Sequence, residues 1–289
     1  MKLVTFHCRG VRSIGKVVGK QIVDLPASDP AIPRTMLELL QGGPAAMARA
    51  SAVEMLAAVT YPLADVRLDA PVPNPSKFLA IGMNYRRHVQ EAVAAGIKVP
   101  DSQVWFNKNV SCITGPFDPV HLPRASNQLD YEAELGVVIG RRCRHVSVAD
   151  APSVVAGYLV CNDVSVRDWQ MRSPTMVLGK SFNTHGPMGP WLMTSEDIPD
   201  PHALRMRMVV NDEVRQDVRT DEMIYNIWDQ IAYLSTVMTL EPGDVLATGT
   251  PSGVGGAMKP PRYLGVGDLM RVEIEGLGYI ENVVVAEPA

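Results

Sequence analysis

The chain has 289 residues, enough for one large domain or for a large domain with a small one. Its composition, 46% hydrophobic and 20% charged with 23 Gly and 23 Pro, is that of a globular, loop-rich protein and excludes a disordered or fibrous one. A net charge of -4 without a basic stripe argues against nucleic acid, and no apolar run reaches the roughly 20 residues of a membrane span. With no secretory signal at the start, we expect a cytoplasmic protein that does not contact a membrane.

The first 70 residues predict a small α/β unit. Two segments look like short strands around a Gly-containing turn, and two have the apolar spacing and alanine content of helices. The strands are expected within 2–8 and 16–25, and the helices within 35–41 and 46–59. The segment "APVPNPS" that follows holds three prolines in seven positions, which disfavour a helix there. We therefore expect a small N-terminal domain at 1–70 and a larger domain at 71–289.

The larger part predicts mostly strands. A buried strand at 77–85 leads into a short helix at 86–100 that stops near Gly96 and Pro100, and a second helix is expected at 224–239. The other predicted strands lie within 129–140, 154–166, 204–216, 244–249 and 268–285. The segment "VLGKSFNTHGPMGPW" is interpreted as a loop because Gly and Pro punctuate it. The sum is a β-rich α+β fold.

Two glutamates lie on alternate positions of "LDYEAELGVVIG" (129–140), which otherwise predicts a buried strand. Because side chains alternate across a strand, Glu132 and Glu134 point to the same side. The solvated face of an edge strand would be the simpler interpretation of an isolated E-x-E pattern. However, the segment continues into "GVVIG", which has no polar face, and the apolar segment "YLVCNDVS" ends near a third acid, Asp163. Three converging carboxylates repel one another unless a cation neutralises them, so these residues predict a metal site.

The chemistry of this donor set limits the metal. Carboxylate oxygens suit hard ions, so Mg²⁺ and Mn²⁺ fit, Ca²⁺ fits as well, and Zn²⁺ does not. Three protein ligands leave about three of the roughly six positions around Mg²⁺ to water or substrate. The predicted metal site is therefore open to catalysis.

Two residues after Asp163 are candidates for binding a substrate carboxylate. "DVSVRDWQ" supplies Arg167 and Gln170, which share one face if a helical turn starts there. The planar guanidinium of Arg can donate two parallel hydrogen bonds to a carboxylate. The alternative for Arg167 is a surface ion pair with Asp168 or another nearby acid.

Three further residues lie in segments rich in Gly. Lys180 lies in the predicted loop among apolar residues, where its desolvated ammonium needs an anion or a polarised oxygen beside it. The alternative is an ordinary lysine that snorkels to solvent. His185 in the same loop is interpreted as a hydrogen-bonded structural residue. In "LATGTPSGVG", Thr250 and backbone N–H groups are available to an anion, and the alternative is the packing of a tight turn.

The helix "NYRRHVQEA" places His88 and Glu91 three residues apart, hence on one face. A carboxylate that orients an imidazole is the arrangement that draws a proton from water. Most such pairs are solvated helix surface, so this pattern indicates a catalytic dyad only together with the other residues.

Taken together, these segments resemble the fumarylacetoacetate hydrolase superfamily. The resemblance covers roughly residues 75 to 285 and rests on five blocks in the family's order: "GMNYRRHVQEA", "YEAELGVVIG", "NDVSVRDWQ", "LGKSF" with "GPMGPW", and "LEPGDVLATGTPSGVG" followed by "MKPPRYLGVGD". It implies the family's mixed β-sheet roll, a homodimer, and Mg²⁺ or Mn²⁺ on Glu132, Glu134 and Asp163. It also implies a His88–Glu91 dyad on a mobile segment. Arg167, Gln170, Lys180 and Thr250 match positions that hold the 2-oxo carboxylate or the developing oxyanion.

Our leading hypothesis for the activity is the hydrolysis of a carbon–carbon bond in a 2,4-dioxo acid, an acylpyruvate or fumarylpyruvate, through a metal-stabilised pyruvate enolate. The alternative enzyme uses the same enolate to decarboxylate oxaloacetate, or to isomerise or decarboxylate a ring-cleavage product of the 2-hydroxyhepta-2,4-diene-1,7-dioate type in aromatic catabolism. A third hypothesis is a binding protein in which the acids hold a structural Ca²⁺. That protein would have no use for Lys180, His88 and Glu91.

Overall fold

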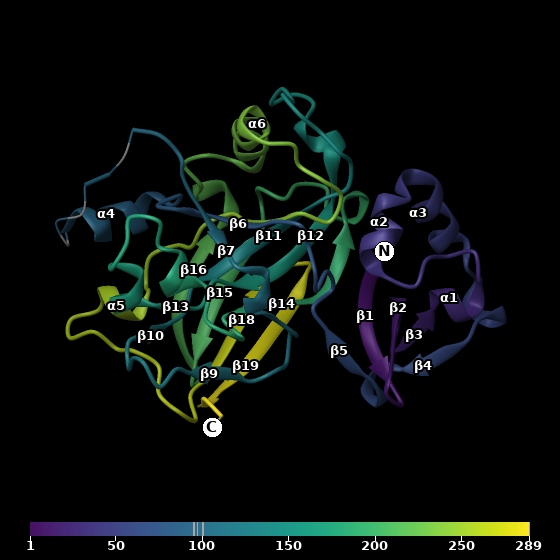
Figure 1. The fold of residues 1–289 in the computed structure, drawn as a ribbon, viewed down its shortest axis with the longest axis horizontal. Coiled ribbons are helices and arrows are strands. Elements are labelled where there is room, and N and C mark those ends of the chain that lie inside the picture. The colour runs from purple at the N-terminus through teal and green to yellow at the C-terminus, as the bar shows by residue number, and fades with distance from the viewer. Residues whose placement is uncertain (95, 97, 100, 289) are drawn as a thin grey trace.

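The computed structural model describes residues 1–94, 96, 98–99 and 101–288. Figure 1 shows a β-rich body with the N-terminal segment, drawn in purple, packed at one side of it. The described strands form one 12-stranded sheet, one five-stranded sheet and one two-stranded ribbon. The predicted β-rich α+β fold is thereby confirmed. None of the helices in the described residues is long and apolar enough to cross a membrane.

The 12-stranded sheet has the order β4-β3-β2-β1-β14-β12-β11-β17-β6-β7, with β5 paired to β1 and β8 to β14. Its strands are β1 (Lys2–Cys8), β2 (Val11–Val18), β3 (Gln21–Asp24), β4 (Thr60–Pro62), β5 (Arg67–Asp69), β6 (Phe78–Gly82), β7 (Val104–Lys108), β8 (Ile113–Thr114), β11 (Ala133–Ile139), β12 (Val155–Asn162), β14 (Gly186–Thr194) and β17 (Val245–Ala247). The sheet therefore runs without interruption from the N-terminal unit to the strands that carry the acids.

The five-stranded sheet has the order β16-β15-β18-β19-β9, and β10 pairs with β13. Their bounds are β9 (Val120–Leu122), β10 (Leu129–Asp130), β13 (Ser165–Val166), β15 (Arg205–Val210), β16 (Glu213–Arg219), β18 (Leu269–Ile274) and β19 (Gly278–Ala286). The α-helices are α1 (Leu25–Ser28), α2 (Met36–Gln41), α3 (Gly43–Ala52), α4 (Arg86–Ala94), α5 (Arg167–Gln170) and α6 (Ile227–Val237).

The N-terminal unit contains the predicted strands, but one predicted helix is shorter than expected. The helix expected over 46–59 is α3, which ends at Ala52 because Val53 and Glu54 adopt extended backbone. β1 pairs with β14 through Lys2 and Leu3, so this unit continues the large sheet. The division into domains at residue 70 stays a prediction.

The strand predicted over 129–140 is interrupted. β10 ends at Asp130 and β11 begins at Ala133. Between them, the backbone N–H of Glu132 donates to the side chain of Asn162 (3.0 Å), and Glu132 accepts a bond from the backbone N–H of Asp163 (2.9 Å). The break fixes Glu132 against the end of β12.

Both faces of β11 and β12 are covered, so a polar side chain on either strand is withdrawn from water. Leu135 and Tyr158 belong to the core that includes Met206 and Val272 of the five-stranded sheet. Residues of the opposite parity, among them Val138 and Cys161, belong to a second core with residues of α2. Glu134 is four residues before Val138 and Asp163 is two residues after Cys161, so each acid points to the same face as that residue. The two acids therefore lie on the same side of the sheet.

Further segments differ from the predicted elements. The strand predicted over 268–285 is a hairpin, in which a turn at 275–277 joins β18 to β19. The end of the predicted loop 177–191 is strand β14, which lies between β1 and β12. The pairing of β14 with β12 is irregular between Tyr158 and Val160, opposite Pro190, and bulges of this kind accommodate a proline in a sheet. The strand predicted over 204–216 is a hairpin, because Asn211 and Asp212 both have positive φ (49° and 66°) and form the turn that joins β15 to β16.

Candidate metal centre and active site

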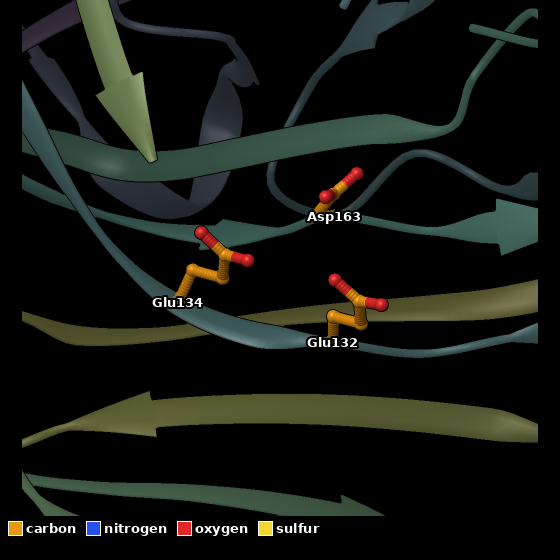
Figure 2. Close-up of side chains that lie close together, drawn as sticks. All are labelled: Glu132, Glu134 and Asp163. Atoms are coloured by element: carbon orange, nitrogen blue, oxygen red, sulfur yellow. The ribbon is translucent and has the colours of Figure 1, made fainter. Parts of the chain in front are cut away.

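Three carboxylates meet where β11 and β12 lie side by side. Glu132, Glu134 and Asp163 each offer an oxygen within 4.8 Å of the others, and Figure 2 shows their side chains pointing into one space. Their side chains are buried, with exposed fractions of 5%, 1% and 0%. A solvated edge strand, the alternative interpretation of the E-x-E pattern, is therefore wrong.

One carboxylate of the cluster, Glu134, has no cationic partner in the described part of the chain. Burial, together with the charges of Asp163 and Glu132, raises the pKa of Glu134 well above its ordinary value. Glu134 accepts a hydrogen bond from the backbone N–H of Gly249 (2.8 Å), but no basic side chain in the described residues lies within ion-pair distance of it. Three oxygens this close match the ~2.0 to 2.6 Å bonds of Mg²⁺, Mn²⁺ or Ca²⁺. The residues therefore fit a hard divalent cation.

Lys180 lies at the end of the turn Val177–Lys180, with an exposed fraction of 2%. Its Nζ donates to Glu132 Oε2 (2.8 Å) and to Asp163 Oδ2 (2.7 Å). Burial opposes the ionisation of Glu132, but Lys180 and Arg167 outweigh it and lower the pKa of Glu132 to about 2. Lys180 is not a snorkelling lysine. It is a buried cation at the rim of the carboxylate cluster.

A second buried lysine, Lys108, was not among the predicted site residues. It ends β7 and its side chain is fully buried. Its Nζ donates to Asp163 Oδ1 (2.6 Å) and to the backbone carbonyl of Lys180. The only signal in the sequence is a lysine that closes the strand "VWFNK". Lys108 holds Asp163 from the side opposite Lys180.

Arg167 begins α5 and contacts two buried acids. Its Nε donates to Asp130 Oδ2 (2.8 Å), and its Nη1 donates to Glu132 Oε1 (2.5 Å) and to Gln170 Oε1 (2.9 Å). The alternative of a surface pair with Asp168 is wrong. Nη2 is buried and has no acceptor among the described residues. Arg167 therefore keeps free donor hydrogens for a ligand.

The glycine-rich segment after β17 binds the protein's own acids. The N–H of Gly253 donates to Glu91 Oε1 (3.0 Å), and those of Gly255 and Gly256 donate to the two oxygens of Asp130 (2.8 Å each). Thr250 is buried, and its Oγ1 accepts a bond from Gln216 (2.9 Å). The sequence left these N–H groups either available to an approaching anion or packed in a tight turn. In the structure they fix Asp130 and Glu91, and Asp130 is a further site residue that the sequence did not reveal.

His88 and Glu91 form a pair on α4. His88 Nδ1 lies 3.1 Å from Glu91 Oε2, and Glu91 is held through its other oxygen by Gly253. The helix ends at Ala94, in agreement with a stop near Gly96, whereas Pro100 lies outside the described residues.

One cavity of about 380 Å³ connects these groups. Seven of the nine predicted site residues line it: His88, Glu91, Glu132, Arg167, Gln170, Lys180 and Thr250. Glu134 and Asp163 belong to the same cluster but not to the cavity wall. The arrangement can hold an anionic ligand beside the carboxylate cluster, with a histidine–glutamate pair on another part of the wall.

Comparisons with known proteins agree with this arrangement. A family model described as fumarylacetoacetate (FAA) hydrolase C-terminal matches residues 77–285, so the chain belongs to the fumarylacetoacetate hydrolase family and is an enzyme of that superfamily. Among sequence relatives, it is 42% identical over 269 residues to oxaloacetate tautomerase Fahd2a, mitochondrial, of Rattus norvegicus, covering 93% of this chain and 85% of that protein.

Two solved structures extend the comparison. Maleylpyruvate hydrolase from Sphingobium sp. SYK-6, in complex with manganese(II) ion and pyruvate, is 34% identical with a TM-score of 0.84, and each chain is covered fully. Fumarylacetoacetate hydrolase from psychrophilic Exiguobacterium antarcticum is 36% identical with a TM-score of 0.87, covering 99% of this chain and 100% of that one.

Proposed function

We propose that the protein is a divalent-metal-dependent enzyme that converts a 2-oxo acid through its enolate. The observation that carries the proposal is the buried cluster of three carboxylates beside Arg167, whose Nη2 has no acceptor in the described part of the chain. Glu132, Glu134 and Asp163 would hold Mg²⁺ or Mn²⁺. When bound there, such an ion would polarise the 2-oxo group and stabilise the negative charge of the enolate.

The protein's own side chains bind and orient the acid. The free donors of Arg167 suit a substrate carboxylate, and Gln170, which contacts Arg167 (2.9 Å), holds the guanidinium in place. Lys180 supplies a positive charge at the edge of the cavity where oxygen charge builds up. Buried cations in a water-poor site act more strongly than they would in solution.

The reaction that the geometry favours is the hydrolysis of a 2,4-dioxo acid. His88, oriented by Glu91, takes a proton from a water molecule whose oxygen forms a bond to the C4 carbonyl carbon. The C3–C4 bond then breaks and its electron pair passes to the pyruvate enolate. The proton held by His88 returns to C3, so the products are pyruvate and a carboxylic acid. The maleylpyruvate hydrolase with bound pyruvate supports this reaction.

A second reaction, the keto–enol tautomerisation of oxaloacetate, is favoured by one observation. The sequence relative with 42% identity over 93% of this chain is an oxaloacetate tautomerase. Tautomerisation needs the same enolate and a group that moves one proton, but no water. The His88–Glu91 pair is able to move that proton without a nucleophile.

The test is a pair of assays on the purified protein with Mg²⁺, Mn²⁺ or a chelator. With acetylpyruvate, hydrolysis is followed by the loss of enol absorbance and by pyruvate release. With oxaloacetate, tautomerisation is followed by the change in enol absorbance without release of CO₂. We expect turnover with either metal ion and none with the chelator. No reaction of either acid in the presence of metal would contradict the proposed function.

A further inference from the structure

The cavity wall away from the carboxylate cluster is apolar. Phe106 lies against the Lys180 ammonium (5.0 Å), and Met176 Sδ accepts a bond from Gln170 (3.6 Å), so these two side chains belong to the end that holds Arg167 and Lys180. The remaining apolar side chains of the lining include Ile81, Met83, Val104 and Val254. They come from β6, the residue that follows it, β7 and the segment after β17, so several elements converge to build this wall. A ligand held by Arg167 and Lys180 at one end would place its other end against these side chains.

That wall offers no counter-ion to a second charged group. The basic side chains on the described part of the cavity lining are His88, Arg167 and Lys180. Each of them already contacts an acid: His88 contacts Glu91, and both Arg167 and Lys180 contact Glu132. Arg262, the neighbour of the lining residue Tyr263, pairs with Glu213 instead (3.1 Å). Burying a carboxylate without a cation is costly, so an anionic group fits poorly here.

Two methionines of the cavity lining have strained backbone. Met83 has a φ of 56° and Met176 has a φ of 58°, a left-handed conformation that residues other than Gly rarely adopt. Such a conformation tends to occur at functional sites. Met83 lies five residues before His88 and Met176 four before Lys180, so both strained positions lead into the elements that carry the site. Methionine is flexible and adapts its shape to an apolar ligand.

We propose that this enzyme takes 2-oxo acids whose far substituent is uncharged and apolar, and that Met83 selects for it. The inference rests on the proposed function, because it assumes that the 2-oxo acid end lies at Arg167 and the carboxylate cluster. It ranks the two reactions proposed above: oxaloacetate would place a carboxylate, or nothing, against the apolar wall, so it should be the poorer substrate.

The test compares three inhibitors with one head group. Oxamate carries the carboxylate and carbonyl of a 2-oxo acid, N-pentyl oxamate adds an apolar tail, and N-(4-carboxybutyl) oxamate adds a tail of similar length that ends in a charge. Dissociation constants are measured by calorimetry with the Mg²⁺-loaded protein. We expect the pentyl compound to bind at least about tenfold more tightly than oxamate, since each buried methylene contributes to affinity. The carboxylated compound should bind at least about tenfold more weakly than the pentyl compound.

A substitution assigns the selection to Met83. Met83→Lys should bring the affinity for the carboxylated compound up to or above that for the pentyl compound. Met55→Lys, on an exposed methionine of the N-terminal unit, is the matched control and should leave the order unchanged. Equal or tighter binding of the carboxylated compound by the unmodified protein would overturn the inference alone. Binding of none of the three would contradict the proposed function and the inference with it.

Discussion

Lys108 and Asp163 form an ion pair that solvent does not reach. Lys108 Nζ lies 2.6 Å from Asp163 Oδ1, and both side chains have an exposed fraction of 0%. The other oxygen of Asp163, Oδ2, accepts a hydrogen bond from Lys180 Nζ. The two lysines thus hold the carboxylate from both sides, which fixes its orientation toward Glu132 and Glu134.

Breaking this pair should destabilise the fold. Lys108→Met leaves a buried carboxylate with one cation fewer, and we expect the free energy of unfolding to fall by about 3 kcal/mol. In the double variant with Asp163→Asn, part of the loss should return, because the uncompensated charge is then removed. Denaturant unfolding of the four proteins in a chelator gives the coupling energy. Strictly additive losses would show that the two residues do not stabilise one another.

Metal binding should depend on Glu134. At about 100 times the dissociation constant, Mn²⁺ would stabilise the unmodified protein by about 2.7 kcal/mol. Differential scanning calorimetry should show the midpoint rising by several degrees, and Glu134→Gln should abolish this rise. The variant is expected to fold without metal, because the raised pKa of Glu134 indicates that a neutral side chain is tolerated there. Glu241→Gln, at the surface beside Arg142, is the control that keeps the rise.

The role of His88 can be separated from metal binding. His88→Ala should lower the turnover of acetylpyruvate by roughly two to four orders of magnitude, the range for losing a positioned acid–base group. The Mn²⁺-induced shift of the melting midpoint should stay as in the unmodified protein. His7→Ala, in β1, should change neither quantity. An unchanged rate in a folded His88→Ala protein would remove His88 from the mechanism.

His185 should make the fold sensitive to acid. It is fully buried, its Nε2 lies 2.8 Å from the carbonyl oxygen of His121, and burial lowers its pKa to about 3. In the unfolded chain, His185 binds a proton near pH 6.5. The contribution of neutral His185 to the free energy of unfolding is therefore fully present above that pH and is lost as the pH falls toward 3.

The measurement for His185 is urea unfolding at pH 7.5 and 4.5 in a chelator. The unmodified protein should lose about 2 to 3 kcal/mol more over this interval than His185→Gln, which has no group to protonate. The same loss in both proteins would show that His185 does not carry the effect.

Segments with strong local patterns were predictable from the sequence. The helix expected over 224–239 is α6, and Asn226 and Asp229 form a capping box that starts it two to three residues later than its apolar spacing indicates. That Glu134 and Asp163 lie on one side of the sheet followed from the alternation of side chains on two buried strands. Glu132 lies in the break between β10 and β11, which the sequence did not predict. His185 was interpreted as a hydrogen-bonded structural residue, which agrees with its burial and its contact to the carbonyl oxygen of His121.

Features that depend on distant partners were not predictable. β14 has two prolines, which argue against a central strand until its partners β1 and β12 and the bulge are known. Lys108 and Asp130 are single residues whose partners lie 55 and 37 positions away in the chain. No neighbouring residue in the sequence indicates that Lys108 and Asp130 belong to the site. The homodimer and the cytoplasmic location remain predictions.

The pairing of β1 with β14 has a consequence for the first residues of the chain. β14 lies next to β12, the strand that leads to Asp163, and Lys2 and Leu3 cover its stretch at Leu192 and Met193. Without them, open backbone groups would invite a strand from another molecule and promote edge-to-edge aggregation. Because this protection is given by main-chain atoms, it does not depend on which side chains the strand carries. The identities of Leu3, Val4 and Phe6 are instead constrained by the cores that their buried side chains fill.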